Sequence, residues 1–214
     1  MRTSRLAAAL LLIMLLGAAG CGGDDSASPA AGDCADVDAP APRDPGTFDA
    51  PEQLLPTNVR HTLTFTTSCG TFTIDLTPNT APRATASLVA LAEADYFDDT
   101  VFHRIVPGFV IQGGDPTQTG GGGPGYTTVD PPPSDARYVR GTVAMAKTLD
   151  EPPGAAGSQF FVVTADDAGL PPDYAIVGTV SGDGLQVVER IGELGDESEL
   201  PTRTVRVEDV AVGP

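Results

Sequence analysis

Short segments rich in β-branched and apolar residues recur from residue 61 to residue 210, and turn-forming residues separate them. In residues 61–67 and 71–76, apolar and polar residues alternate on either side of Ser68-Cys69-Gly70, which predicts a β-hairpin. The other segments of this kind are residues 101–106, 109–112, 142–146, 159–164, 174–180 and 204–210. A set of many short strands has to protect its sheet edges, and closing the sheet on itself does so.

Two stretches show the apolar spacing of helices instead. Residues 83–94 follow Pro82, which suits a first helical turn, and residues 184–194 form the second stretch. Residues 113–137 are rich in Gly and Pro and predict a long irregular loop. The pattern therefore predicts a mainly β domain, a closed antiparallel eight-stranded β-barrel capped by two α-helices. Side chains fill a barrel this small, so we expect a binding groove on its outer surface.

The beginning of the chain has a different composition. Residues 1–20 combine Arg2 and Arg5 with an uncharged apolar run, which is typical of a secretion signal peptide and too short to span a bilayer. The segment 18–21, Ala-Ala-Gly-Cys, resembles the bacterial lipobox. This resemblance implies cleavage before Cys21, lipidation of Cys21 and anchoring to the outer face of the bacterial cell membrane. The alternative is an ordinary secretion signal that leaves Cys21 free.

Residues 21–56 predict a disordered acidic tether between this anchor and one domain, residues 57–214. Residues 22–56 carry eight acidic residues and one basic residue, and few large apolar side chains that could form a core. Cys34 lies in this tether and Cys69 in the predicted hairpin turn. An exported compartment permits a disulfide between them, but the sequence is equally compatible with two free thiols.

Charge and residue usage exclude several classes of function. The formal net charge of −17 argues against binding nucleic acid or anionic headgroups by charge. His61 and His103 are the only histidines, and with the cysteines they lack the spacing of metal ligands. The run of glycines at 120–123 is not followed by the Lys-Ser/Thr of a phosphate-binding loop.

Four stretches, in order, carry the strongest functional signal: residues 102–115, 141–146, 157–164 and 174–178. Together they resemble the cyclophilin family of peptidyl-prolyl cis/trans isomerases, and the resemblance covers nearly all of residues 57–214. It implies an isomerase that acts on proline-containing polypeptide clients without a cofactor or a metal. In an exported chain, it implies a role in folding exported or surface proteins. We expect a monomer.

The chemistry that the resemblance implies requires few groups. Rotation about an Xaa-Pro bond has a barrier of about 18–20 kcal/mol because the nitrogen conjugates with the carbonyl. In the twisted state the proline nitrogen regains a lone pair, and a donor that binds this lone pair stabilises the transition state alone. Arg104 matches the catalytic Arg of the family, and Gln112 matches the Gln that contacts this Arg and the substrate backbone.

The resemblance also implies a binding surface around these two residues. It assigns the proline pocket to Phe109, Phe161 and Leu170 and places Val110 and Met145 beside this pocket. Gln159 and Ala146 match the positions that hold the extended peptide. Tyr174 forms a wall of the pocket, at a position where many members of the family have His. His103 is expected to be a hydrogen-bonded support. Gly169 stands where a Trp favours cyclosporin, so we expect weak cyclosporin binding.

A rival interpretation is a surface module or holdase that binds proline-containing segments with little turnover. Lys147 and Val177 depart from the family pattern near the pocket and favour this alternative. Arg104 and Gln112 favour the enzyme, because binding alone needs no donor to the proline nitrogen.

Overall fold

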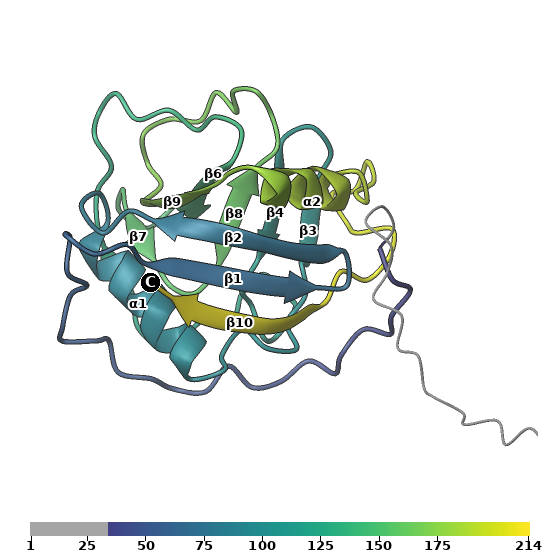
Figure 1. Cartoon of the computed structure of the whole chain (residues 1–214), viewed down its shortest axis with the longest axis horizontal. Coiled ribbons are helices and arrows are strands. Elements are labelled where there is room, and N and C mark those ends of the chain that lie inside the picture. The colour runs from purple at the N-terminus through teal and green to yellow at the C-terminus, as the bar shows by residue number, and fades with distance from the viewer. Residues whose placement is uncertain (1–33) are drawn as a thin grey trace, which may run out of the picture.

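The computed structural model describes residues 34–214, so the predicted signal peptide and Cys21 lie outside the described residues. Its main sheet contains eight antiparallel strands in the order β10-β1-β2-β9-β6-β8-β4-β3 (Figure 1). These strands are β1 (Thr62–Thr67), β2 (Gly70–Leu76), β3 (Arg104–Val106), β4 (Val110–Gly113), β6 (Thr142–Met145), β8 (Phe160–Val163), β9 (Ile176–Val180) and β10 (Val207–Gly213). Each lies within or overlaps one of the predicted segments. A separate pair, β5 (Thr128–Val129) and β7 (Ala155–Ala156), was not predicted.

The main sheet curls into a half-barrel and does not close, so the prediction of a closed barrel is wrong. Its two edges are β3 and β10, which do not pair with each other. The chain segments that precede these strands meet at an isolated bridge between Val101 and Arg206 and at a few backbone hydrogen bonds around it, such as that from Phe102 N–H to Val205 O at 3.1 Å. At the edge of β3, the backbone N–H of Ile105 donates to the carbonyl of Glu199 at 3.0 Å. A loop that precedes β10 therefore occupies the position that a closing strand would need.

The hydrophobic core lies inside the curl of the sheet. Phe65 stacks on Phe72 with ring centroids 5.2 Å apart, and Phe160 lies at the same distance from Phe65. Helix α1 (Pro82–Glu93) packs against β10, and helix α2 (Asp183–Gly192) packs against β2 (Figure 1). Neither of these helices is long and apolar enough to cross a membrane. Each buried aromatic side chain contributes about 1.5–3 kcal/mol relative to exposure, so this cluster is a main source of stability.

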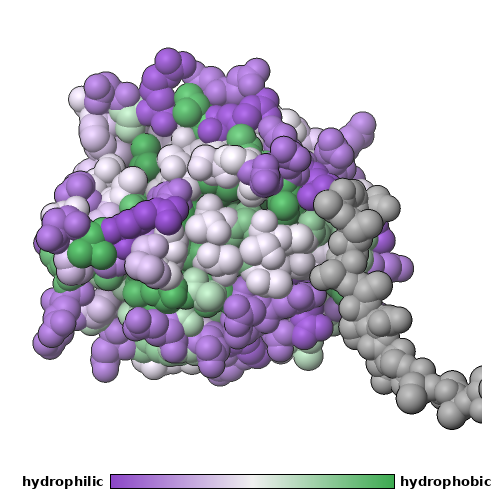
Figure 2. Space-filling view, in the orientation of Figure 1, coloured by the Kyte–Doolittle hydropathy of each residue, from purple (hydrophilic) through white to green (hydrophobic). Residues whose placement is uncertain are grey.

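The outer face of the β1–β2 hairpin carries the polar half of the predicted alternation. Thr64 and Thr73 share a hydrogen bond of 3.1 Å between their hydroxyl groups across the two strands. On this face of the molecule, residues of near-neutral hydropathy occupy the centre and hydrophilic residues surround them (Figure 2). The period-two pattern of the hairpin therefore separates core from solvent as the sequence predicts.

Residues 34–56 are not the disordered segment that their composition predicts. They run along the outside of the domain before entering β1 (Figure 1). The backbone N–H of Arg43 donates to Pro116 O at 3.0 Å, and that of Phe48 donates to Pro124 O at 2.9 Å. The ring of Phe48 packs edge-on against Tyr96, with centroids 5.4 Å apart. A few such anchors hold a segment that is too polar to form a core of its own.

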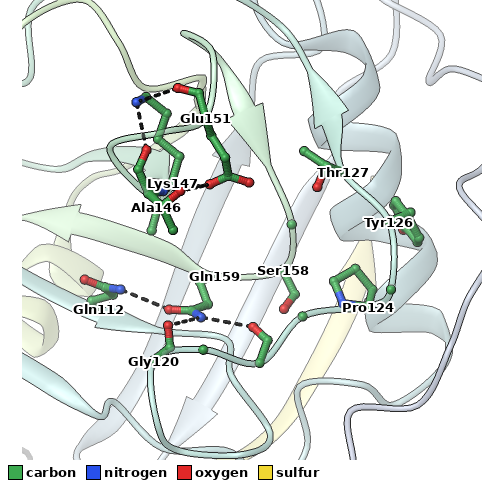
Figure 3. A pocket seen from close by; sticks show the side chains of 16 residues that line it. Gln112, Gly120, Pro124, Tyr126, Thr127, Ala146, Lys147, Glu151, Ser158 and Gln159 are labelled. Carbon is green, nitrogen blue, oxygen red and sulfur yellow. Dashed lines mark hydrogen bonds between the residues drawn. The ribbon is translucent and has the colours of Figure 1, made fainter.

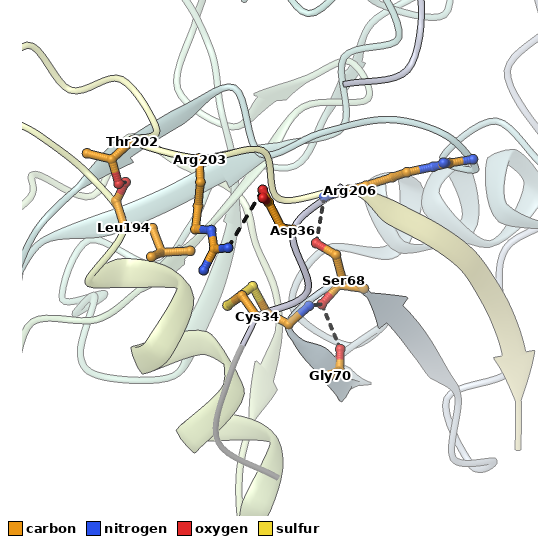
Figure 4. The surroundings of a disulfide bond; sticks show 10 residues. Cys34, Asp36, Ser68, Gly70, Leu194, Thr202, Arg203 and Arg206 are labelled. Carbon is orange, nitrogen blue, oxygen red and sulfur yellow. Dashed lines mark hydrogen bonds and ion pairs between the residues drawn. A yellow bond between two sulfur atoms is a disulfide. The ribbon is translucent and has the colours of Figure 1, made fainter. Parts of the chain in front are cut away.

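A disulfide between Cys34 and Cys69 fastens the start of this segment to the turn between β1 and β2 (Figure 4). Both cysteines are buried. The backbone N–H of Ala35 donates to Ser68 O at 2.7 Å, next to the disulfide. The pairing that the sequence left open is therefore present in the structure.

Two buried carboxylates hold the long loop between β4 and β6. Near one end, Asp130 accepts hydrogen bonds from the backbone N–H groups of Arg83 (2.8 Å) and Ala84 (2.7 Å). These groups belong to the first turn of α1, which has no cap from its own neighbouring side chains. Near the other end, Asp115 binds the backbone of the glycine-rich segment, which forms part of the candidate site.

Candidate active site

A row of side chains crosses four adjacent strands on the outer face of the sheet. Arg104 on β3 lies opposite Gln112 on β4, Gln112 lies opposite Phe161 on β8, and Phe161 lies opposite Ala144 on β6. Directly opposite residues in an antiparallel sheet have Cβ atoms about 4.5–5.5 Å apart. The register therefore places a guanidinium, an amide and an aromatic ring side by side on one surface.

This surface contains a small cavity of about 210 Å³. It is lined by Arg104, Phe109, Val110, Gln112, Ala146, Lys147, Phe161, Leu170 and Tyr174. One wall is apolar, and there the rings of Phe161 and Tyr174 meet edge-on with centroids 5.4 Å apart. The opposite side is polar and holds Arg104 and Gln112. The cavity thus offers an apolar slot with a fixed donor beside it.

Strand alternation explains which predicted residues reach this cavity. Phe161 belongs to the small apolar cluster under the groove, whereas its neighbour Phe160 belongs to the main core. The same alternation on β6 buries Met145 completely in the main core. The predicted contact of Met145 with substrate is therefore wrong. Every other residue predicted for catalysis or substrate binding lines this cavity or the one beside it.

A chain of hydrogen bonds orders the polar side of the groove. Arg104 Nη1 donates to Gln112 Oε1 at 3.3 Å, and Gln112 Nε2 donates to Gln159 Oε1 at 3.0 Å. Gln159 Nε2 then donates to the carbonyl oxygens of Gly120 (2.9 Å) and Gly122 (3.0 Å) (Figure 3). In both glutamines, the side-chain oxygen accepts a bond from the side of Arg104 and the side-chain nitrogen donates away from it. The side chain of Gln112 is thereby fixed with an acceptor facing the guanidinium.

A second, larger cavity of about 470 Å³ continues from the first (Figure 3). Gln112, Ala146 and Lys147 line both cavities. Lys147 Nζ donates to the carbonyls of Thr148 and Glu151, both at 3.1 Å, and lies 5.7 Å from the centre of the Tyr174 ring. The ammonium group of Lys147 therefore forms part of the ridge between the two cavities, a role that the sequence did not reveal.

His103 lies beneath this surface and is uncharged at neutral pH. Burial lowers the pKa of His103 below its ordinary value of 6.5, and the opposing effect of the Asp115 charge is smaller. Neither ring nitrogen has a hydrogen-bond partner among the residues that the structure describes. Within residues 34–214, the ring of the predicted support therefore makes no hydrogen bond of good geometry, and it packs under the groove.

Asp115 anchors the glycine-rich wall of the second cavity. Its carboxylate accepts hydrogen bonds from the backbone N–H groups of Thr117 (2.7 Å), Gly120 (2.7 Å) and Gly122 (3.1 Å), and from the Thr117 hydroxyl. Burial raises the pKa of Asp115, but these hydrogen bonds together outweigh burial and hold the pKa below its ordinary value of 3.8. The ionised carboxylate thus fixes the same glycines whose carbonyls bind Gln159.

Replacing Asp115 with asparagine is expected to lower the free energy of unfolding at pH 7 by about 2 kcal/mol or more, because hydrogen bonds to a charged group are lost. Folding lowers the pKa of the Asp115 carboxyl below its ordinary value of 3.8. The carboxylate therefore stabilises the folded protein at any pH above 3.8, and this stabilisation is lost as the pH falls through the pKa of the folded state. Urea unfolding at a series of pH values should show the two proteins converging at acid pH. Asp150→Asn, at an exposed residue, is the control. A constant difference at all pH values would contradict the account.

The structure adds one residue to the site that sequence reasoning missed. Glu199 Oε2 accepts a hydrogen bond from Arg104 Nε at 2.7 Å. The two residues are 95 positions apart, and Glu199 belongs to a short acidic stretch that resembles any solvated turn. No local sequence signal identifies it, because only the fold brings this turn to the edge of β3.

Relatives of known sequence match most of the domain. A fungal protein, peptidyl-prolyl cis-trans isomerase-like 1 of Emericella nidulans, is 36% identical over 141 residues, which is 64% of this chain and 85% of that protein. The peptidyl-prolyl cis-trans isomerase CYP57 of Arabidopsis thaliana is 39% identical over 132 residues, or 60% of this chain. The matched region spans only 26% of the length of the Arabidopsis protein, so the chain corresponds to about a quarter of that relative.

Solved structures and the family comparison agree with these relatives. A crystal structure of a Cryptosporidium parvum cyclophilin type peptidyl-prolyl cis-trans isomerase superposes with a TM-score of 0.64 and 29% identity, over 73% of this chain and 99% of that one. A second structure of that protein, crystallised in the presence of the dipeptide Ala-Pro, has a TM-score of 0.63, with 30% identity over 72% of this chain and 99% of that one. The family described as cyclophilin type peptidyl-prolyl cis-trans isomerase/CLD matches residues 62–212. With its eight-stranded half-barrel, its two helices and this match, the chain belongs to the cyclophilin-type peptidyl-prolyl cis-trans isomerase family.

Proposed function

We propose that this chain catalyses the cis/trans isomerisation of Xaa-Pro peptide bonds. The observation that carries this proposal is the row of Arg104, Gln112 and Phe161 across three adjacent strands. It puts a guanidinium donor beside an apolar slot on a surface that an extended peptide can reach. Membership of the isomerase family supports the same activity.

The groove suits a reaction in which no bond is made or broken. The slot holds the pyrrolidine ring between Phe109, Phe161 and Leu170, while Val110 and Tyr174 complete its walls. As the bond twists, the proline nitrogen becomes a hydrogen-bond acceptor, and Arg104 donates to it. The planar isomers have no such acceptor, so this interaction lowers the barrier without tightening the ground state.

The rest of the groove orients the substrate. Gln112 holds the guanidinium through its oxygen, and Gln159 and Ala146 line the path of the extended peptide. The second cavity accepts side chains that flank the proline, and Lys147 stands at the ridge between the two cavities. The related Cryptosporidium protein was crystallised in the presence of Ala-Pro, and a dipeptide of this kind has the proline ring that the apolar slot would take.

The test uses NMR exchange spectroscopy to detect cis/trans exchange in a short Xaa-Pro peptide in the presence of a substoichiometric amount of protein. Without catalyst, one isomerisation takes on the order of tens to hundreds of seconds. We expect exchange cross-peaks between the cis and trans forms on the sub-second mixing times at which the peptide alone gives none. Peptide binding without any exchange would instead support the rival holdase or binding module.

We further propose that the chain is exported and anchored to a membrane through lipid on Cys21. Support comes from the sequence alone: the basic start, the apolar run and the lipobox-like segment before Cys21. In a bacterial host fed with labelled palmitate, the chain should incorporate the label, and Cys21→Ser should not. An unlabelled wild-type chain would overturn this proposal and leave the isomerase activity untouched.

A further inference from the structure

We propose that Glu199 is a positioning residue that fixes the Arg104 guanidinium in its productive orientation. This inference rests on the isomerase function proposed above and deepens it. Among the ion pairs of residues 34–214, the pair between Arg104 and Glu199 is the one that includes a residue lining the groove. The other pairs of the described residues lie outside the groove.

Two contacts hold the guanidinium from different sides. Arg104 Nε donates to Glu199 Oε2 at 2.7 Å, and Arg104 Nη1 donates to Gln112 Oε1 at 3.3 Å. A planar group held at two of its nitrogens cannot turn its face without breaking one of the bonds. The donors of Nη2 make no hydrogen bond within the described part of the chain, so they remain free for the substrate.

The turn that carries Glu199 is itself fixed to the edge of β3. The carbonyl of Glu199 accepts the N–H of Ile105, the residue after Arg104, at 3.0 Å. Asp196 Oδ1 accepts the N–H groups of Ser198 (2.8 Å) and Leu200 (3.2 Å), which closes the turn around Glu199. The backbone of Glu199 has φ of +65°, a region that residues other than glycine seldom adopt. The backbone thus places the Glu199 carboxylate beside the side chain of Arg104.

The exposure of the pair indicates orientation rather than stability as its role. The side chains of Arg104 and Glu199 are 33% and 49% exposed, and pairs of this kind contribute little to folding. An arginine held by its contact with Gln112 alone could still turn about that contact, and a substrate would have to order it on every turnover. Glu199 orders the side chain before the substrate arrives, which benefits a reaction that depends on the direction of one hydrogen bond.

The carboxylate of Glu199 could act by holding Arg104 Nε in place or through its charge alone, and these two effects predict different activities for the variant Glu199→Gln. If Glu199 acts by holding Nε in place, Glu199→Gln keeps an acceptor oxygen and should retain more than half of the activity. If it acts through its charge, glutamine should behave like alanine, and removal of the charge should strengthen Arg104 as a donor and speed the reaction. The structure favours the first effect, because the contact is a direct hydrogen bond to Nε.

The experiment compares Glu199→Ala, Glu199→Asp and Glu199→Gln with the wild type, all in the full chain. The matched control is Glu189→Ala, which removes the same charge from a pair with Arg140 on another part of the surface. Peptide exchange at saturating substrate, peptide affinity and the melting temperature are measured for each. The Nε–H resonance of Arg104 in ¹⁵N NMR spectra reports whether the contact forms in solution.

We expect Glu199→Ala to lower saturated turnover by about three- to fivefold, because an exposed pair is worth about 1 kcal/mol at most. Peptide affinity, the melting temperature and the Glu189→Ala control should stay close to wild type. Glu199→Asp, which keeps the charge on a shorter side chain, should lose turnover in the same direction. The Arg104 Nε–H signal should be protected from exchange in wild type and control, and lose protection in Glu199→Ala.

The outcomes separate this inference from the function on which it rests. If the wild type accelerates exchange and Glu199→Ala does so equally well, the positioning role is overturned and the isomerase function stands. The positioning role is also overturned if Glu199→Gln is as slow as Glu199→Ala, or if the Arg104 signal does not depend on Glu199. A wild type without turnover overturns the isomerase function, and this inference with it.

Discussion

Replacing Arg104 with alanine is expected to reduce isomerase turnover by about 100- to 1,000-fold, the usual cost of removing one donor aimed at a developing charge. The substitution removes the cationic group that the sheet register places opposite Gln112. Peptide affinity should change little, because the apolar slot around Phe161 remains and the proline nitrogen of the planar peptide bond has no free lone pair for Arg104. NMR exchange spectroscopy measures the turnover, and titration of the same peptide measures the affinity.

Two further variants show whether this loss is specific. Arg104→Lys keeps the charge but lacks the planar fork of donors, and is expected to remain far below wild type. Arg140→Ala removes an exposed arginine from ion pairs with Asp166 and Glu189 and should leave turnover unchanged. The mechanism is contradicted if Arg104→Ala keeps most of its turnover. It is also contradicted if turnover and affinity fall together, since the guanidinium would then only bind the substrate.

Much of the fold could be predicted because alternation along each strand is a local property. The segments around Phe65 and Phe72 show the inward half of the pattern directly, and both side chains are in the core. Closure of the barrel is not local, since it depends on whether two edge strands meet. The turn that holds Glu199 takes the edge of β3, and nothing in the sequence of either strand reveals this. The two-residue strands of the β5–β7 pair are too short to show any period.

The candidate site was predictable where neighbouring residues share a strand. Phe160 and Phe161 had to face opposite ways, and the structure places them so. Met145 on β6 lies opposite Phe160. The same rule, applied to β6, would have put Met145 in the core and would have avoided its assignment to the substrate-binding surface. Glu199 could not be found in this way, because its contact with Arg104 spans 95 residues and depends on the packing of a turn.

Composition misled the prediction for residues 34–56, and the reason is specific. A polar, proline-rich segment cannot order itself through its own apolar contacts. Here the order comes from contacts that the segment makes with the domain: the Phe48 ring on Tyr96, the backbone bond from Arg43 to Pro116, and the disulfide of Cys34. Each is a single residue in a long segment, so an average over the composition does not detect them.

The disulfide is expected to be the largest single contributor to the stability of this arrangement. Removing it with Cys34→Ala and Cys69→Ala together should lower the free energy of unfolding by about 3–4 kcal/mol, since the bond closes a loop with a sequence separation of 35. The bond restricts the unfolded chain, and its loss also frees the N-terminal segment to leave the surface. Urea unfolding of the double variant and of the wild type measures the difference.

The same bond should also influence the groove, because the segment that it fastens lies against the glycine-rich wall. The N–H of Phe48 donates to Pro124 O, which lies in the loop lining the second cavity. In the double variant, amide hydrogen exchange should therefore become faster at Phe48 and at residues 120–125. The amides of β8, in the core, should remain the more strongly protected ones. A reductant should reproduce these effects in the wild type and do nothing to the variant. If the variant unfolds at the wild-type urea concentration, the segment is held by its backbone and aromatic contacts alone, and the disulfide adds nothing to them.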